Sequence, residues 1–171
     1  MSNRKIWNRV AHGMIGVAML AASALASAED VALKPADIGK LLPATVFYRG
    51  QTATTQARNS GGVKFSDGYF VLTALVDTSG YSTGVTAKYQ AYFITEVPIK
   101  ICGQPLPAGA YGIGFIADNK FVVTDLGAHD VLTVNSATDS NLKRPMPLQI
   151  LPDPDHGFRL YAGRQYVMLE R

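Results

Sequence analysis

The chain has one cysteine, one tryptophan and three histidines, and these scarcities limit what the protein can be. Cys102 has no second cysteine to pair with, so the fold must be stabilised by packing rather than by an internal disulfide. Trp7 lies near the N-terminus, in a segment that processing would remove, which disfavours a carbohydrate site built on a tryptophan. The few histidines leave little material for a catalytic or metal site.

Residues 1–28 have the features of a Sec signal peptide. Three basic residues lie among the first nine positions, residues 14–25 are apolar, and Ala26-Ser27-Ala28 forms a small-residue cleavage motif before Glu29. The alternative is an uncleaved membrane anchor, which needs about 20 apolar residues. The apolar stretch here spans only residues 14–25, a length typical of a signal peptide. We therefore expect residues 29–171 to be a periplasmic or secreted protein with no stable membrane span after cleavage.

Acidic excess and basic excess are both missing from the expected mature chain. The whole sequence carries a formal charge of +3, from 16 basic and 13 acidic residues. Arg4, Lys5 and Arg9 belong to the expected signal peptide and no acidic residue precedes Glu29, so 13 residues of each sign remain. Because nucleic-acid binding requires a basic surface, we expect no nucleic-acid partner.

Long amphipathic helical patterns are also scarce. Only Pro35 to Leu42 has helical spacing, with Ile38, Leu41 and Leu42 at i, i+3 and i+4. After Pro43, short runs rich in β-branched and aromatic residues alternate with turn residues, which is typical of an all-β protein. The predicted strands lie near Thr45 to Arg49, Gly62 to Phe65, Tyr69 to Val76, Ala87 to Ile101, Tyr111 to Ile116, Phe121 to Thr124, Val131 to Val134, Leu148 to Leu151, Phe158 to Tyr161 and Gln165 to Leu169.

Residues 29–171 are therefore predicted to form a single β-rich domain, an antiparallel β-sandwich or barrel with one short N-terminal helix. Asp67-Gly68 and Asp118-Asn119 each separate two apolar runs and tolerate positive φ, so both predict tight hairpins. Pro98 interrupts the longest predicted strand, where a bulge or an edge would accommodate it.

One segment carries a family resemblance. The run from Gly103 to Tyr111 reads G-x-x-L-P-A-G-x-Y and lies between a strand and a further apolar strand. It resembles the central hairpin of a family of exported bacterial β-sandwich domains of unknown function. The resemblance implies the fold and the export, and no activity.

Gly80-Tyr81-Ser82-Thr83-Gly84 matches the G-x-S-x-G motif of the α/β-hydrolases, which places a nucleophilic serine between a strand and a helix. The residues that follow are β-branched and aromatic with no helical stripe, and no α/β alternation surrounds them. We therefore interpret the segment as a polar loop, and predict that no hydrolytic activity depends on Ser82.

Two histidines follow the expected cleavage site, and each lies beside acidic residues. These are His129-Asp130 and the segment Asp153-Pro154-Asp155-His156. An imidazole with a carboxylate can bind a divalent metal or transfer protons, but a structural metal site needs about four ligands. Aspartate beside proline is also ordinary in turns, which we favour for both segments. Whether the fold brings His129 and His156 together stays open.

Cys102 follows Ile99-Lys100-Ile101 at the end of an apolar run. We expect it to be a small buried hydrophobic residue that does not react in the native state. The alternatives are a reactive thiol and an intermolecular disulfide.

Two hypotheses for the function remain. The first is an exported, non-enzymatic β domain that binds a small ligand or a cell-envelope partner. The second is a small hydrolase or metal-dependent enzyme that uses His129, His156 and a nearby aspartate, or Ser82. We favour the first because active sites need clusters of titratable groups, and few are present. The sequence thus singles out no catalytic, cofactor-binding or metal-ligating residue.

Overall fold

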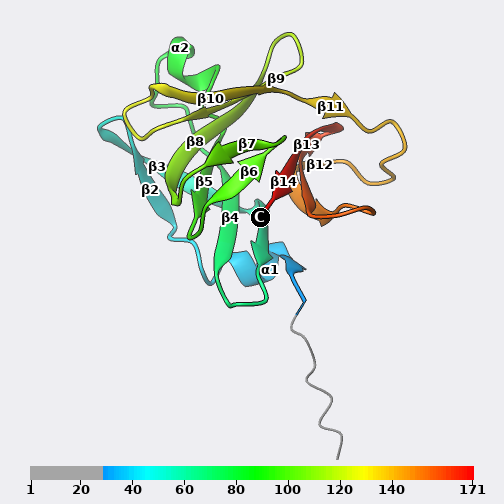
Figure 1. Cartoon of the computed structure of the whole chain (residues 1–171). Coiled ribbons are helices and arrows are strands. Elements are labelled where there is room, and N and C mark those ends of the chain that lie inside the picture. The colour runs from blue at the N-terminus through cyan, green and yellow to red at the C-terminus, as the bar shows by residue number, and fades with distance from the viewer. Residues whose placement is uncertain (1–28) are drawn as a thin grey trace, which may run out of the picture.

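The computed structural model describes residues 29–171 and shows two antiparallel β-sheets packed against each other (Figure 1). The first sheet has the order β1 (Val31–Leu33), β3 (Gln51–Lys64), β4 (Phe70–Val76), β5 (Ala91–Thr95), β8 (Gly109–Ile116), β9 (Lys120–Thr124) and β10 (Asp130–Asn135), and β2 (Thr45–Tyr48) pairs with β3. The second has the order β12 (Met146–Pro152), β13 (Phe158–Gly163), β14 (Gln165–Glu170), β6 (Ile99–Ile101) and β7 (Gln104–Leu106), and β11 (Ala137–Thr138) pairs with β14. The all-β prediction is confirmed, as a sandwich.

The chain crosses between the sheets at two prolines. Pro98 lies between β5, in the first sheet, and β6, in the second, so the predicted interruption is confirmed, but as a crossing between sheets rather than as a bulge or an edge. Pro107 lies between β7, in the second sheet, and β8, which returns to the first. There the Tyr111 hydroxyl donates a hydrogen bond to the Pro107 carbonyl at 2.9 Å. Residues 103–111 thus form a passage from one sheet to the other.

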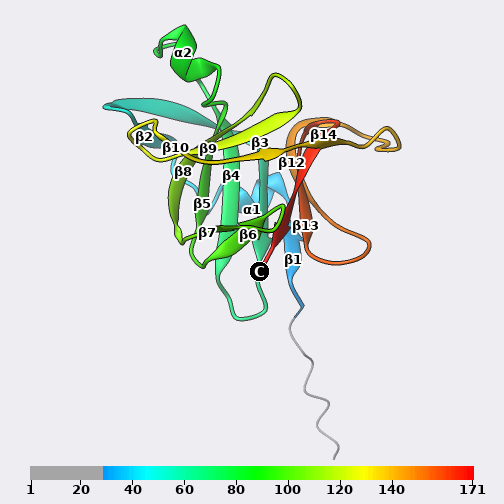
Figure 2. The ribbon, with the colours of Figure 1, turned by 45° about the horizontal axis from the view of Figure 1, so that its top comes forward.

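The prediction of one long strand from Ala87 to Ile101 is wrong. A four-residue helix, α2 (Thr83–Thr86), precedes this region, and β5 begins only at Ala91. Apolar residues here are buried without forming a strand: Val85 lies in α2, and Tyr89 lies in the segment between α2 and β5. The helix projects beyond the end of the sheets (Figure 2).

The predicted N-terminal helix is present but shorter than expected. It is α1 (Pro35–Ile38), and a turn follows it at Gly39. Ile38 is fully buried and lies near Leu72 on the outer face of the first sheet, whereas Leu41 is 45% exposed. Between residues 29 and 171, no helix has the length and apolar character needed to span a membrane.

Left-handed backbone conformations make several of the hairpins possible. Both predicted hairpins are confirmed: Gly68 has φ +94° in the β3–β4 turn, and Asp118 and Asn119 have φ of 59° and 53° between β8 and β9. Two further pairs of residues with positive φ form two-residue turns, Arg49-Gly50 between β2 and β3 and Cys102-Gly103 between β6 and β7. Positive φ at both residues is the signature of a type I′ turn.

The main core lies between the two sheets, and its fully buried side chains include Phe93, Leu106, Phe121 and Leu160. Beside it, a second cluster stacks Tyr48 on Tyr89 with ring centroids 3.7 Å apart.

Glycine allows this stacking: a Cβ on Gly112 would lie 2.6 Å from the Tyr48 ring and 2.8 Å from that of Tyr89. At one corner of the sandwich the sheets approach closely, because a Cβ on Gly61 of β3 would lie 2.6 Å from the Ile150 nitrogen of β12.

Candidate functional site

A pocket of about 170 Å³ opens at one end of the sandwich and reaches into the main core. Its walls come from both sheets and are apolar: Val63, Phe65, Val71, Ile99, Phe158 and Leu169. The entrance lies where β3 and β14 end and β4 begins, near the position marked C in Figure 1. The site is therefore a gap between two sheets whose inner faces supply only hydrocarbon.

Polar side chains surround the mouth of this pocket: the charged residues Asp30, Glu170 and Arg171, and His156. Asp30 is fixed from one side, because its Oδ1 accepts a hydrogen bond from the Ser66 backbone N–H at 2.8 Å. Glu170 faces His156, with Oε1 3.5 Å from Nε2. We call these four residues the rim: two carboxylates, a guanidinium and an imidazole border a hydrocarbon interior.

Arg171, the cation of the rim, already forms an ion pair and stacks on an aromatic ring. Its guanidinium lies 2.5 Å from the Asp67 carboxylate and 4.8 Å from the centre of the Phe65 ring. The hydrogen bond from Arg171 is the largest cause that holds the pKa of Asp67 below its usual value. Arg171 therefore forms part of the pocket structure, joining β14 to the β3–β4 turn.

A loop between β12 and β13 forms the side of the rim that contains His156 and Gly157. Asp153 begins this loop, and its Oδ1 accepts hydrogen bonds from the backbone N–H groups of Asp155 (2.9 Å) and His156 (3.3 Å). Led by the bond from Asp155, these contacts lower the pKa of Asp153. Gly157 has φ +71°, and a Cβ there would lie 2.5 Å from the Leu169 carbonyl oxygen. The loop thus packs tightly on β14.

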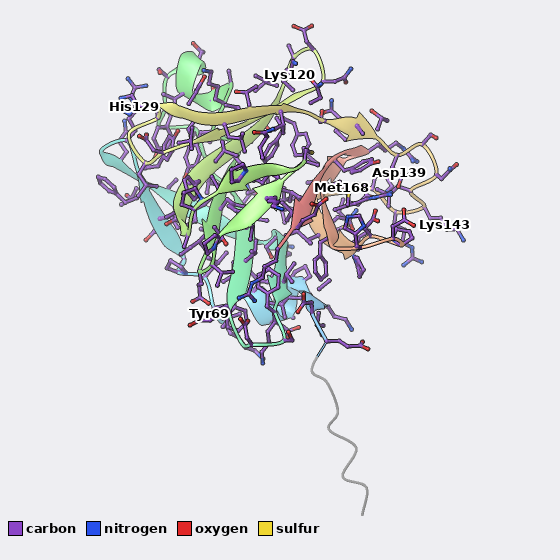
Figure 3. The ribbon with its side chains drawn as sticks, viewed as in Figure 1. Tyr69, Lys120, His129, Asp139, Lys143 and Met168 are labelled. Carbon is purple, nitrogen blue, oxygen red and sulfur yellow. The ribbon has the colours of Figure 1, made fainter. Side chains whose placement is uncertain are left out.

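The structure separates the two histidines. His129 lies between β9 and β10, with Nδ1 3.0 Å from Asp125 Oδ2, and its neighbour Asp130 instead pairs with Lys88 at 2.6 Å. In Figure 3, His129 lies at the opposite end of the molecule from Tyr69, whose turn adjoins the pocket that contains His156. The side chain of His129 is 81% exposed and that of His156 is 71% exposed. Within residues 29–171, no three His, Cys, Asp or Glu side chains gather as a metal site requires.

Ser82 is exposed and immediately precedes α2. Its side chain makes no capping hydrogen bond, and none of the hydrogen bonds among residues 29–171 joins it to a histidine. The expectation that no helix follows Ser82 is wrong, although α2 has only four residues. The adjacent Tyr81 holds this loop in place, since its hydroxyl donates to the backbone carbonyls of Tyr48 and Gln51.

The prediction that Cys102 is buried is also wrong. Cys102 is exposed, with φ 48°, at the first position of the two-residue turn between β6 and β7. The turn begins one residue earlier than the apolar pattern suggests, so the side chain leaves the sheet instead of entering the core. Its Sγ accepts a hydrogen bond from the Met168 backbone N–H at 3.4 Å. The thiol borders an open groove formed with β10.

No family model, curated protein or solved structure matches this chain, so the resemblance of residues 103–111 stays a prediction.

No sequence pattern points to the rim residues Asp30, Glu170 and Arg171 or to the pocket walls. The rim residues come from three distant segments and form no motif. The one sequence feature that lies at the rim is the aspartate-rich segment before His156, and its residues are also those of an ordinary turn.

Proposed function

We propose that the protein is an exported, non-enzymatic binding domain that holds the apolar part of a small ligand in the pocket between the sheets. The observation that carries this proposal is a hydrocarbon-lined pocket whose mouth alone bears charged groups. Ligand sites in proteins commonly combine apolar walls with a few polar groups that fix orientation.

The size of the pocket limits the ligand. Sites for drug-sized molecules span about 300–1,000 Å³, whereas a cavity of about 150 Å³ accepts benzene. At about 170 Å³, the pocket suits a single ring or a short alkyl chain, with the rest of the ligand at the mouth. This favours a small ligand over a cell-envelope partner, the other form of the binding hypothesis.

The arrangement of titratable residues favours binding over catalysis. A hydrolase or metal-dependent enzyme using His129, His156 or Ser82 needs these groups within hydrogen-bond reach of one another. Instead, His129 pairs with Asp125, His156 faces Glu170, and Ser82 bonds to neither histidine among residues 29–171.

Export forms part of this proposal and has its own test. Residues 1–28 lie outside the described residues, so the signal peptide is proposed from the sequence alone. Expressed in a Gram-negative host, the protein is expected in the periplasm with Glu29 at its N-terminus and without tryptophan fluorescence, because Trp7 is the only tryptophan. A membrane-bound product that retains Trp7 would contradict export by cleavage.

The binding proposal is tested by NMR titration with hexan-1-ol, a neutral probe whose alkyl chain matches the pocket. We expect the largest chemical-shift changes at wall residues, among them Val63, Val71 and Phe158, with saturation at about millimolar concentration. Changes confined to the groove between β7 and β10, or no saturable change, would overturn the proposal.

A further inference from the structure

We propose that the ligand of this pocket is an amphipathic amine, whose hydrocarbon group fills the apolar walls and whose ammonium lies at the rim between Asp30 and Glu170. This inference rests on the function proposed above and adds the chemical class of the ligand. It follows from two observations at the mouth of the pocket: the numbers of negative and positive side chains, and which of these side chains already form an ion pair.

Negative charge predominates at the mouth. Two carboxylates line it, those of Asp30 and Glu170, against one guanidinium, that of Arg171, whose charge is offset by Asp67 outside the pocket lining. Arg171 pairs directly with Asp67 and is attracted to Asp30 only from beyond 4 Å, and neither Asp30 nor Glu170 has a Lys or Arg nitrogen within 4 Å in the described part of the chain. Cleavage before Glu29 would add an α-ammonium one residue from Asp30 together with the Glu29 carboxylate, so the sum of the charges stays the same. His156 is the one basic side chain in contact with Glu170, and a neutral imidazole leaves the carboxylate charge in place.

The residues that carry these carboxylates line the mouth of the pocket. Glu170 directly follows the wall residue Leu169 on β14, and Asp30 is tied to Ser66, the neighbour of the wall residue Phe65. Lys100 is the cross-strand partner of Glu170, but its amine lies more than 4 Å from that carboxylate. An ammonium carries three donors and no acceptor, which suits a mouth that offers carboxylate oxygens.

A ligand carboxylate fits this rim poorly. It would bring a third negative charge beside Asp30 and Glu170, and would have to compete with Asp67 for Arg171. A neutral alcohol would occupy the same walls without the electrostatic contribution. The rim therefore ranks ligands with the same chain as amine, then alcohol, then carboxylate.

The experiment compares hexylamine, hexan-1-ol and hexanoate at pH 7 and low ionic strength, with dissociation constants measured by NMR titration of the expected mature chain, residues 29–171. We expect hexylamine to bind about fivefold or more tightly than hexan-1-ol, and hexanoate to bind most weakly. Glu170→Gln and Asp30→Asn should each weaken hexylamine binding about two- to fivefold and leave hexan-1-ol unchanged. Asp118→Asn, in the β8–β9 turn, removes a carboxylate that does not line the pocket and should change neither.

The outcomes separate this inference from the proposed function. If hexan-1-ol binds as tightly as hexylamine, or if Glu170→Gln and Asp30→Asn leave hexylamine affinity unchanged, the amine assignment is wrong and the pocket stands. If hexanoate bound most tightly, the amine assignment would likewise be wrong, and Arg171 would be the group that binds the ligand carboxylate. If none of the three binds at the walls, the proposed function itself fails.

Discussion

The Arg159 Nε lies 2.5 Å from the Asp153 Oδ2, and this ion pair anchors the loop that forms one side of the pocket mouth. The Asp153 side chain is only 3% exposed, and its other oxygen accepts the two backbone N–H groups of the loop. Arg159 also stacks over the Tyr166 ring, 4.6 Å from its centre. The shape of the rim around His156 therefore depends on a carboxylate that does not itself line the pocket.

Replacing Asp153 with Ala should lower the melting temperature by several degrees and weaken hexan-1-ol binding. The change removes one of the two carboxylates that pair with Arg159, the other being Asp139. It also leaves the loop N–H groups of Asp155 and His156 without their acceptor. Asp155→Ala is the matched control, because Asp155 contributes a backbone N–H that alanine keeps. Equal melting temperatures for the two variants in a thermal unfolding measurement would show that the loop does not need this ion pair.

Stability should decrease in acid. The pKa values of Asp67, Asp125 and Asp153 are lowered from 3.8, chiefly by hydrogen bonds from Arg171, His129 and Asp155 respectively. A lowered pKa means that the unfolded chain takes up these protons first, so the stabilisation is present above about pH 4 and is lost as pH falls through the folded-state values. Urea unfolding from pH 7 to pH 2 should show this loss, and Asp153→Asn should flatten it. A stability independent of pH below 4 would contradict these contacts.

Adding a methyl group at Gly112 should destabilise the protein by about 1–3 kcal/mol, because it would collide with the stacked rings of Tyr48 and Tyr89. Gly84→Ala is the control: a Cβ there has no neighbour within 4 Å and lies in α2, where alanine stabilises a helix by up to about 1 kcal/mol. Denaturant unfolding of both variants measures the difference. A neutral Gly112→Ala would mean that the rings are not packed on β8.

Cys102 should react with a maleimide in the native state, since its side chain is exposed at the tip of a hairpin. The turn conformation has its own test. Cys102→Asn should preserve stability, because asparagine tolerates positive φ, whereas Cys102→Val should cost about 1–3 kcal/mol. Slow labelling that speeds up only on denaturation would restore the buried thiol expected from the sequence.

The sequence allowed prediction of the features that depend on neighbouring residues. Asp118-Asn119 has the chemistry of a two-residue turn, and Pro98 cannot continue a central strand, so both could be placed without the fold. Cys102-Gly103 is the same kind of turn, but cysteine carries no turn preference, and the apolar residues before it suggested burial. Most of strand β3 could not be predicted because its first nine residues, Gln51 to Asn59, are mainly polar and largely exposed.

The pocket could not be predicted because its parts meet only through the sheet order. Asp30 reaches the rim through the pairing of β1 with β3, and His156 through the pairing of β12 with β13. Glu170 arrives at the end of β14, which pairs with β6 across a separation of about 70 residues in the chain. No local pattern encodes such pairings, and single charged residues next to strands are common on any β protein.

The central claim is that a small apolar group binds between the sheets, and the affinity of Val71→Phe for hexan-1-ol tests it most directly. Val71 lines the pocket, so the larger ring has existing space to fill. Val76→Phe, in the second cluster at the other end of β4, has no such space and serves as the control.

We expect Val71→Phe to stay folded and lose hexan-1-ol binding at least tenfold, while Val76→Phe loses about 1–3 kcal/mol of stability and still binds. Wild-type affinity in a folded Val71→Phe variant would contradict the account.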